Sequence, residues 1–222
     1  MTRKERYSAV LDYFRKEMPH VQTELEFGSV FQLLVAVMLS AQCTDKRVNM
    51  VTPELFRRFP DARSMAVADA GEVLEYVRSV SYPNSKADHL VRMARMLVEK
   101  HDGEVPDQMS DLLALPGVGR KTANVVMSVA WGQSVMAVDT HVFRVSRRLG
   151  LVSKKADTPL KVELELVRNI PSADIPRAHH WLILHGRYTC TARKPRCGQC
   201  GLSGVCPSAN LSSCDGGIGS QP

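Results

Sequence analysis

The sequence lacks a long hydrophobic run. Its longest uninterrupted apolar stretch, residues 33–39, is far shorter than the roughly 20 residues that a helix needs to cross a bilayer. The basic start at residues 2–6 is not followed by the apolar segment of a secretory signal. We therefore expect a cytoplasmic protein with no membrane partner.

Aromatic residues are scarce and acidic residues are outnumbered. Phe, Trp and Tyr make up 6% of the 222 residues, too few for the long stacking platform of a single-strand binder. The 29 Lys and Arg residues exceed the 23 Asp and Glu residues, which gives a formal net charge of +6. This charge is compatible with a polyanionic partner but does not prove one. If that partner is DNA, contacts with its backbone should dominate over base stacking.

Sustained alternation of apolar and polar residues, the pattern of a half-buried strand, is also missing. The periodicity is helical nearly everywhere, and the apolar run at residues 31–39 predicts a buried central helix. A Pro-Asn pair within residues 80–85 predicts a non-helical turn. We therefore predict an all-α fold of helices joined by short Gly and Pro turns.

A further helix is predicted to begin at Thr158, as an N-cap followed by Pro159 in the first helical position. The apolar residues expected on its buried face are Leu160, Leu164, Val167 and Ile170.

Four of the six cysteines fall in one short stretch, at Cys190, Cys197, Cys200 and Cys206. In a reducing compartment, clustered thiols favour metal ligation over disulfides. The spacing C-x6-C-x2-C-x5-C holds one CxxC pair, whereas a zinc ribbon normally offers two. Four thiolates without histidine also suit an iron–sulfur cluster. The chemistry thus indicates a metal centre and favours iron–sulfur, with zinc left open.

Residues 115–123 read L-P-G-V-G-R-K-T-A and join two helical stretches. Gly117 and Gly119 allow a tight turn with outward-facing backbone amides, and a second helix is predicted to start at Thr122 and Ala123. Such a site binds anions, and the phosphates of a DNA backbone fit it without base readout. The pattern is that of a helix–hairpin–helix; the alternative is an ordinary tight turn between packed helices.

The sequence resembles the endonuclease III family in the four-cysteine spacing and in four segments, at residues 39–45, 115–126, 137–142 and 180–186. The resemblance covers about residues 1–206 in order. Members of that family are DNA glycosylases with an attached AP-lyase activity. They carry a [4Fe-4S] cluster on this cysteine spacing, so the resemblance implies that cluster where the spacing alone left zinc open.

Release of a base from deoxyribose develops positive charge at C1′, which a carboxylate can stabilise and a lysine amine can capture as a Schiff base. The resemblance implies that Lys121 is this nucleophile and Asp139 the catalytic aspartate. On residue chemistry alone, Lys121 would be a solvated charge and Asp139 a helix N-cap. Asp139 can combine the cap with the catalytic role.

The loop between the first two cysteines holds Arg193, Lys194 and Arg196 and no acidic residue. The family uses this loop on DNA phosphates, which makes these three residues candidate DNA contacts; the alternative is a solvated basic turn. The phosphate-binding hairpin adds Gly117, Gly119 and Arg120 to the candidates.

A glycosylase acting on duplex DNA must extrude the damaged base and fill the gap. In the family a glutamine, here Gln42, enters the duplex. A second wedge comes from a segment in which many members read G-L-Y-N-S-K. This chain reads S-Y-P-N-S-K at residues 81–86, which puts Tyr82 at the wedge position. Because of this departure, the preference for the opposite base does not carry over; the alternative for Tyr82 is a surface aromatic residue.

We expect two helical lobes. Residues 23–133 would form a helical domain with the hairpin, residues 1–22 and 134–206 a helical iron–sulfur domain, and residues 207–222 a disordered tail. The resemblance implies a bifunctional DNA glycosylase and AP lyase of base excision repair. It would remove oxidised pyrimidines from damaged double-stranded DNA and cleave 3′ to the abasic site by β-elimination. We expect a monomer associated with the nucleoid.

Two alternatives differ in chemistry. An adenine-mismatch glycosylase shares the hairpin, the aspartate and the cluster but lacks the nucleophilic lysine, so Lys121 argues against it. A non-catalytic helix–hairpin–helix module with a structural metal would bind damaged DNA without forming an adduct that borohydride can trap.

Overall fold

The structure is a computed structural model that describes residues 1–209. Those residues form helices and no strand, which confirms the all-α prediction. The chain divides into two compact units: Met1–Gln22 with Ser134–Pro222 (unit 1), and Thr23–Gln133 (unit 2). The predicted tail at residues 207–222 lies mostly outside the described residues.

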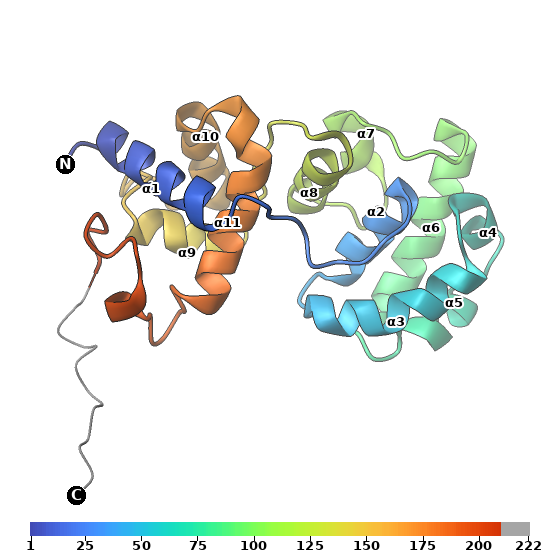
Figure 1. Ribbon diagram of the computed structural model, residues 1–222. Coiled ribbons are helices and arrows are strands. Elements are labelled where there is room, and N and C mark those ends of the chain that lie inside the picture. The colour runs from blue at the N-terminus through green and yellow to red at the C-terminus, as the bar shows by residue number, and fades with distance from the viewer. Residues whose placement is uncertain (210–222) are drawn as a thin grey trace, which may run out of the picture. The chain divides into compact units, whose positions relative to one another are not determined.

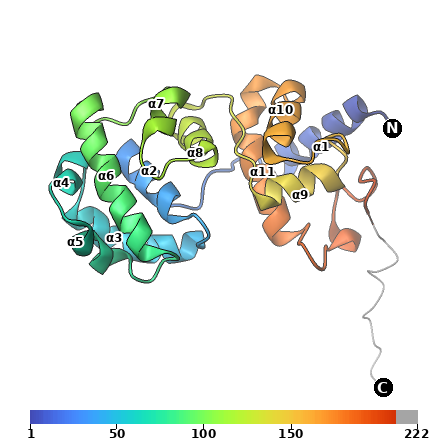
Figure 2. The ribbon, with the colours of Figure 1, turned by 180° about the vertical axis from the view of Figure 1, so that it is seen from behind.

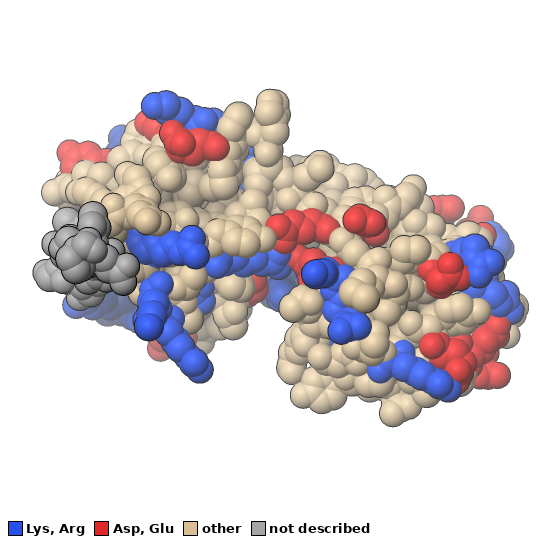
Figure 3. Space-filling view, turned by 60° about the horizontal axis from the view of Figure 1, so that its bottom comes forward, with Lys and Arg blue, Asp and Glu red and all other residues tan. Residues whose placement is uncertain are grey.

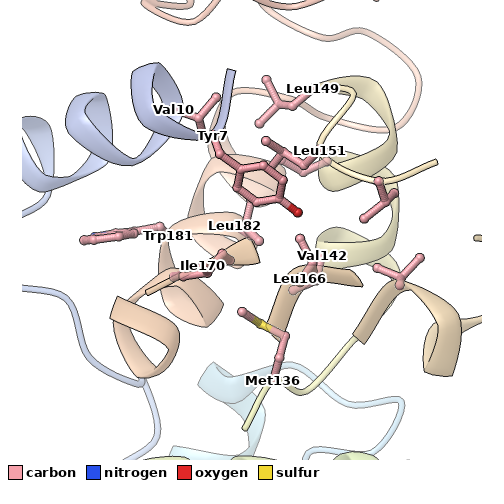
Figure 4. Close-up of a cluster of buried hydrophobic side chains, with 14 of the residues drawn as sticks. Tyr7, Val10, Met136, Val142, Leu149, Leu151, Leu166, Ile170, Trp181 and Leu182 are labelled. Carbon is pink, nitrogen blue, oxygen red and sulfur yellow. The ribbon is translucent and has the colours of Figure 1, made fainter. Parts of the chain in front are cut away.

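Unit 1 is built from the two ends of the chain. Helix α1 packs against α11, which packs against α9, and α10 also packs against α9. Tyr7 and Val10 of α1 enter the same core as Val142 of α9 and Trp181 of α11 (Figure 4). The N-terminal helix is therefore needed to close the core that supports the cysteine-rich loop. The helices of this unit are α1 (Arg3–Glu17), α9 (Thr140–Arg148), α10 (Pro159–Asn169) and α11 (Ile175–Tyr188), with short 3-10 turns η1 (Ser172–Asp174) and η2 (Cys197–Gln199).

Unit 2 is arranged around helix α2. The apolar run predicted to be buried forms α2 (Val30–Leu39), and the side chains from Leu33 to Leu39 are all buried. This helix packs against α3, α6 and α8, while α6 packs against α4 and α5 (Figures 1 and 2). The other helices of this unit are α3 (Asp45–Arg58), α4 (Ala62–Ala66), α5 (Ala70–Val77), α6 (Pro83–His101), α7 (Met109–Ala114) and α8 (Arg120–Trp131).

The predicted turn at residues 80–85 is wrong in its second half, because α6 begins at Pro83. Proline is well suited to the first position of a helix, where its fixed φ is helical and its missing N–H would have no helical partner. The non-helical part therefore ends at Tyr82.

The start of α10 is confirmed, since the Thr158 side chain accepts a hydrogen bond from the backbone N–H of Lys161. Its predicted buried face is wrong in part: Leu160 and Leu164 are 47% and 59% exposed, whereas Val162 and Leu166 are fully buried. The helix carries two apolar i,i+4 pairs on different faces, and only one can meet the core of unit 1.

Candidate active site

The hairpin between α7 and α8 has the geometry that its sequence predicts. Leu115 and Val118 are buried and joined by a backbone hydrogen bond of 3.1 Å, while both glycines are exposed. Gly117 has a φ of 77°, and a Cβ added there would lie 2.9 Å from Cβ of His89 and from Cε of Met38. This position therefore needs glycine both for its backbone conformation and for the close approach of α6 and α2.

Lys121 lies in the first turn of α8, directly after the exposed Arg120. Its side chain is exposed, and it forms no hydrogen bond or ion pair within residues 1–209. The N-cap of α8 is Gly119, which has no side chain to cap the helix N-terminus. Lys121 thus belongs to a helix N-terminus, whose backbone amides can bind an anion.

Asp139 is the N-cap of α9. Its Oδ1 accepts a hydrogen bond of 2.8 Å from the backbone N–H of Val142, and Oδ2 has no hydrogen-bond partner among the described residues. The carboxylate is partly exposed, and the three residues before it, Met136 to Val138, are buried and hold it in place. One oxygen is therefore used by the cap, and the other can face a ligand. Asp139 belongs to unit 1 and Lys121 to unit 2.

The four clustered cysteines line one cavity of about 150 Å3 in unit 1, and none of the four forms a disulfide. In the part of the chain that the structure describes, no three His, Cys, Asp or Glu side chains are arranged to hold a single metal ion. The thiols instead surround a space large enough for a multi-atom cluster. Burial raises the pKa of the Cys200 and Cys206 thiols, so bound cations are needed to hold both as thiolates. These four residues therefore fit an iron–sulfur cluster better than a zinc ion.

The basic loop between the first two cysteines is held by its backbone. Arg148 donates to the carbonyl oxygens of Thr191 and Ala192 at 2.7 and 2.8 Å. The Thr191 hydroxyl donates to the carbonyl oxygen of Lys194 at 2.6 Å. The candidate DNA contacts Arg193, Lys194 and Arg196 are exposed and form no ion pair with any described residue. Several Lys and Arg side chains project together from one face of unit 1 (Figure 3). Their charges are thus presented to solvent from a fixed backbone.

The structure brings the segments of Gln42 and Tyr82 together within unit 2. Both side chains are exposed, and both residues have left-handed backbones, with φ values of 53° and 56°. The hydroxyl of Ser81 donates to the carbonyl oxygen of Gln42 at 2.7 Å.

Sequence reasoning missed Lys86, which is only 8% exposed and donates from Nζ to the carbonyl oxygens of Leu39 and Ala41, each at 2.7 Å. Lysine is rarely buried, so its place in the sequence carries no signal of this role.

Comparisons with known proteins identify the family of this chain. Residues 35–172 match the HhH-GPD superfamily of base excision DNA repair proteins, and residues 190–206 match the iron-sulfur binding domain of endonuclease III. Endonuclease III of Synechocystis sp. is 46% identical over 212 residues, which cover 95% of this chain and 96% of the relative. Endonuclease III of Escherichia coli strain K12 is 46% identical over 197 residues, which cover 89% of this chain and 92% of the relative.

Solved structures give the same result. A trapped endonuclease III–DNA covalent intermediate, in an estranged-adenine complex, has a TM-score of 0.88 at 42% identity and covers 94% of this chain and 98% of that chain. A thermostable thymine-DNA glycosylase shares the fold, with a TM-score of 0.80 at 21% identity.

The helical fold and its hairpin define an HhH-GPD base excision repair protein. Within that class, the chain belongs to the endonuclease III family. The resemblance drawn from the sequence is confirmed, and so is the [4Fe-4S] cluster that it implied. No helix within residues 1–209 is long and apolar enough to span a membrane.

Proposed function

We propose that this chain is a bifunctional DNA glycosylase and AP lyase of base excision repair that excises oxidised pyrimidines from double-stranded DNA. Its family and its similarity to a trapped covalent complex with DNA support the activity. The observation that carries the proposal is the placement of Lys121. Its exposed amine follows a hairpin whose amides can hold a phosphate, so DNA bound there would lie within reach of it.

In the proposed reaction, the unprotonated amine of Lys121 attacks C1′ while the bond from C1′ to the base breaks. The sugar ring then opens as the C1′–O4′ electrons pass to O4′, which leaves a Schiff base between Nζ and C1′. Oδ2 of Asp139 stabilises the positive charge that develops at C1′. Loss of a C2′ proton forms a C2′–C3′ double bond as the 3′ phosphate leaves, and water then hydrolyses the Schiff base.

Other residues bind the DNA. The backbone amides at Gly117 and Gly119 and the side chain of Arg120 bind phosphates near the lesion. Gln42 and Tyr82 fill the space of the everted nucleotide. Arg193, Lys194 and Arg196 bind phosphates farther along the strand. Cys190, Cys197, Cys200 and Cys206 hold the cluster, which supplies structure to the basic loop, because neither base release nor β-elimination transfers electrons.

We further propose that the two units are separate folding domains and that the enzyme acts as a monomer on the nucleoid. One chain supplies both the lysine and the aspartate, which supports the monomer.

Two substrates test the proposal: a duplex with one thymine glycol and a duplex with one abasic site. We expect wild type to release thymine glycol from the first duplex. In each duplex, it should nick the strand that carries the lesion. We expect Lys121→Ala to lower both rates by at least about a hundredfold, because the covalent route is lost. Lys100→Ala, an exposed lysine on α6, serves as the matched control. Equal nicking by Lys121→Ala and wild type would contradict the proposal.

A further inference from the structure

Two segments of unit 2 that carry exposed side chains are tied to each other. The first is the turn at residues 40–43, which follows α2 and carries Gln42. The second is the residue pair before α6, Ser81 and Tyr82. The Ser81 hydroxyl bridges them by donating to the carbonyl oxygen of Gln42 at 2.7 Å. The two segments are therefore in direct contact although about forty residues of chain separate them.

Lys86 ties the same segments from inside the unit. Its Nζ donates to the carbonyl oxygens of Leu39 and Ala41. The last carbonyls of a helix lack partners within it, so this ammonium group satisfies the end of α2 and the start of the Gln42 turn. The backbone N–H of Lys86 donates to the carbonyl oxygen of Tyr82 at 3.1 Å. Lys86 is thus bonded to the Gln42 turn through its side chain and to Tyr82 through its backbone, by the i→i−4 bond that opens α6.

The backbones at Gln42 and Tyr82 need such support. Gln42 and Tyr82 are non-glycine residues in the left-handed region, and Tyr82 also precedes a proline, which further restricts its conformation. Left-handed backbones of this kind persist only where their surroundings hold them. Packing of their own side chains does not supply this, since Gln42 is exposed and Tyr82 is 65% exposed. The hydrogen bonds from Ser81 and Lys86 supply this support.

We infer that Ser81 and Lys86 are positioning residues that hold Gln42 and Tyr82 as one preformed wedge, so that both side chains enter the duplex together. This inference rests on the proposed function, because it assumes that these side chains fill the gap of an everted nucleotide. The Ser81 bond distinguishes this chain from family members that have glycine at this place, since glycine has no hydroxyl to donate.

Insertion can be measured without catalysis. The probe is a duplex with a tetrahydrofuran abasic analogue opposite 2-aminopurine, whose fluorescence rises when it is unstacked. We expect Ser81→Ala to need about fivefold more protein for the same rise, the factor that one ordinary hydrogen bond is worth. Ser81→Thr keeps the hydroxyl and should behave as wild type. The melting temperature of Ser81→Ala should stay close to that of wild type, because the bond lies at the surface.

Lys86→Met removes the ammonium group and keeps an unbranched apolar side chain. We expect it to weaken the fluorescence response by about tenfold, because two carbonyl oxygens lose their donor. Lys100→Met, at an exposed position of the same helix, is the control. Should Lys86→Met fail to fold, as judged by circular dichroism and cluster absorbance, Ser81→Ala and Ser81→Thr still decide the question.

An unchanged response of Ser81→Ala overturns the inference. Borohydride trapping on an abasic duplex separates this failure from failure of the proposed function. If wild type forms the adduct and Ser81→Ala inserts normally, only the positioning role is wrong. If wild type forms no adduct, the lyase assignment is wrong, whereas the fluorescence comparison still tests the wedge.

Discussion

Arg148 places its guanidinium Nη1 3.5 Å from Sγ of Cys190, the first of the four clustered cysteines. Its backbone carbonyl oxygen lies 3.3 Å from Sγ of Cys206, the last of them. Arg148 is also the final residue of α9, the helix that Asp139 caps at the other end. One short helix therefore carries the proposed catalytic carboxylate and braces the cysteine-rich loop.

Arg148→Met should loosen that loop, because it removes the donor to two backbone carbonyls and keeps only the apolar stem. We expect the free energy of unfolding to fall by about 1–3 kcal/mol and the cluster absorbance to disappear at a lower temperature. Arg168→Met, at an exposed position of α10, should leave both unchanged. Identical melting of Arg148→Met and wild type would show that the guanidinium does not brace the loop.

Lys194→Ala should remove one phosphate contact. The slope of log affinity against log salt should become shallower by about 0.9, the value for one neutralised phosphate of duplex DNA. Lys100→Ala removes another exposed charge, in unit 2, and should keep the wild-type slope. A titration of a fluorescent duplex at several salt concentrations gives both slopes, and an unchanged slope for Lys194→Ala would remove this residue from the DNA interface.

The two hairpin glycines should differ in their tolerance of alanine. Gly117→Ala places a Cβ 2.9 Å from two side chains on a left-handed backbone, and should cost about 1–3 kcal/mol of stability. Gly119→Ala meets nothing within 4 Å and should cost less than about 1 kcal/mol, for a poorer helix cap. Urea unfolding measures both values. Equal costs would mean that α6 and α2 do not press on the hairpin at Gly117.

Asp174 joins α1 to the start of α11 through Arg15, whose Nη2 lies 2.5 Å from Oδ2. Arg177 adds a second ion pair at 2.7 Å. The hydrogen bond from Arg15 lowers the pKa of Asp174, which is nearly fully buried. A lowered pKa in the folded state means that the stabilisation is complete above the unfolded value of about 3.9 and is lost as the pH falls through the folded pKa.

Asp174→Asn should therefore lower the free energy of unfolding at pH 7 by about 1–3 kcal/mol. Asp12→Asn removes the exposed partner of the same arginine and should change it by less than about 0.5 kcal/mol. Urea unfolding at pH 7 checks both values. Below pH about 4, wild type should approach the stability of Asp174→Asn; a difference that stays constant in acid would contradict the ion-pair account.

The sequence predicted those features that depend on residues close together in the chain. The hairpin, the Thr158 cap and the buried run of α2 each depend on residues within a few positions of one another. The inward face of α10 could not be predicted, because Leu160 and Leu166 are equally apolar. Packing against the rest of unit 1 determines which of the two is buried. The roles of Ser81 and Lys86 were also hidden, because their partners lie 39 to 47 residues away in the chain.

The proposed reaction depends on a covalent bond between the amine of Lys121 and C1′. The most direct test is to reduce a mixture of wild type and abasic duplex with borohydride, digest it, and locate the deoxyribose remnant by mass spectrometry. We expect the added mass on the peptide that contains Lys121, and no adduct with Lys121→Ala. An adduct on any other residue of wild type, or an equal yield from Lys121→Ala, would contradict it.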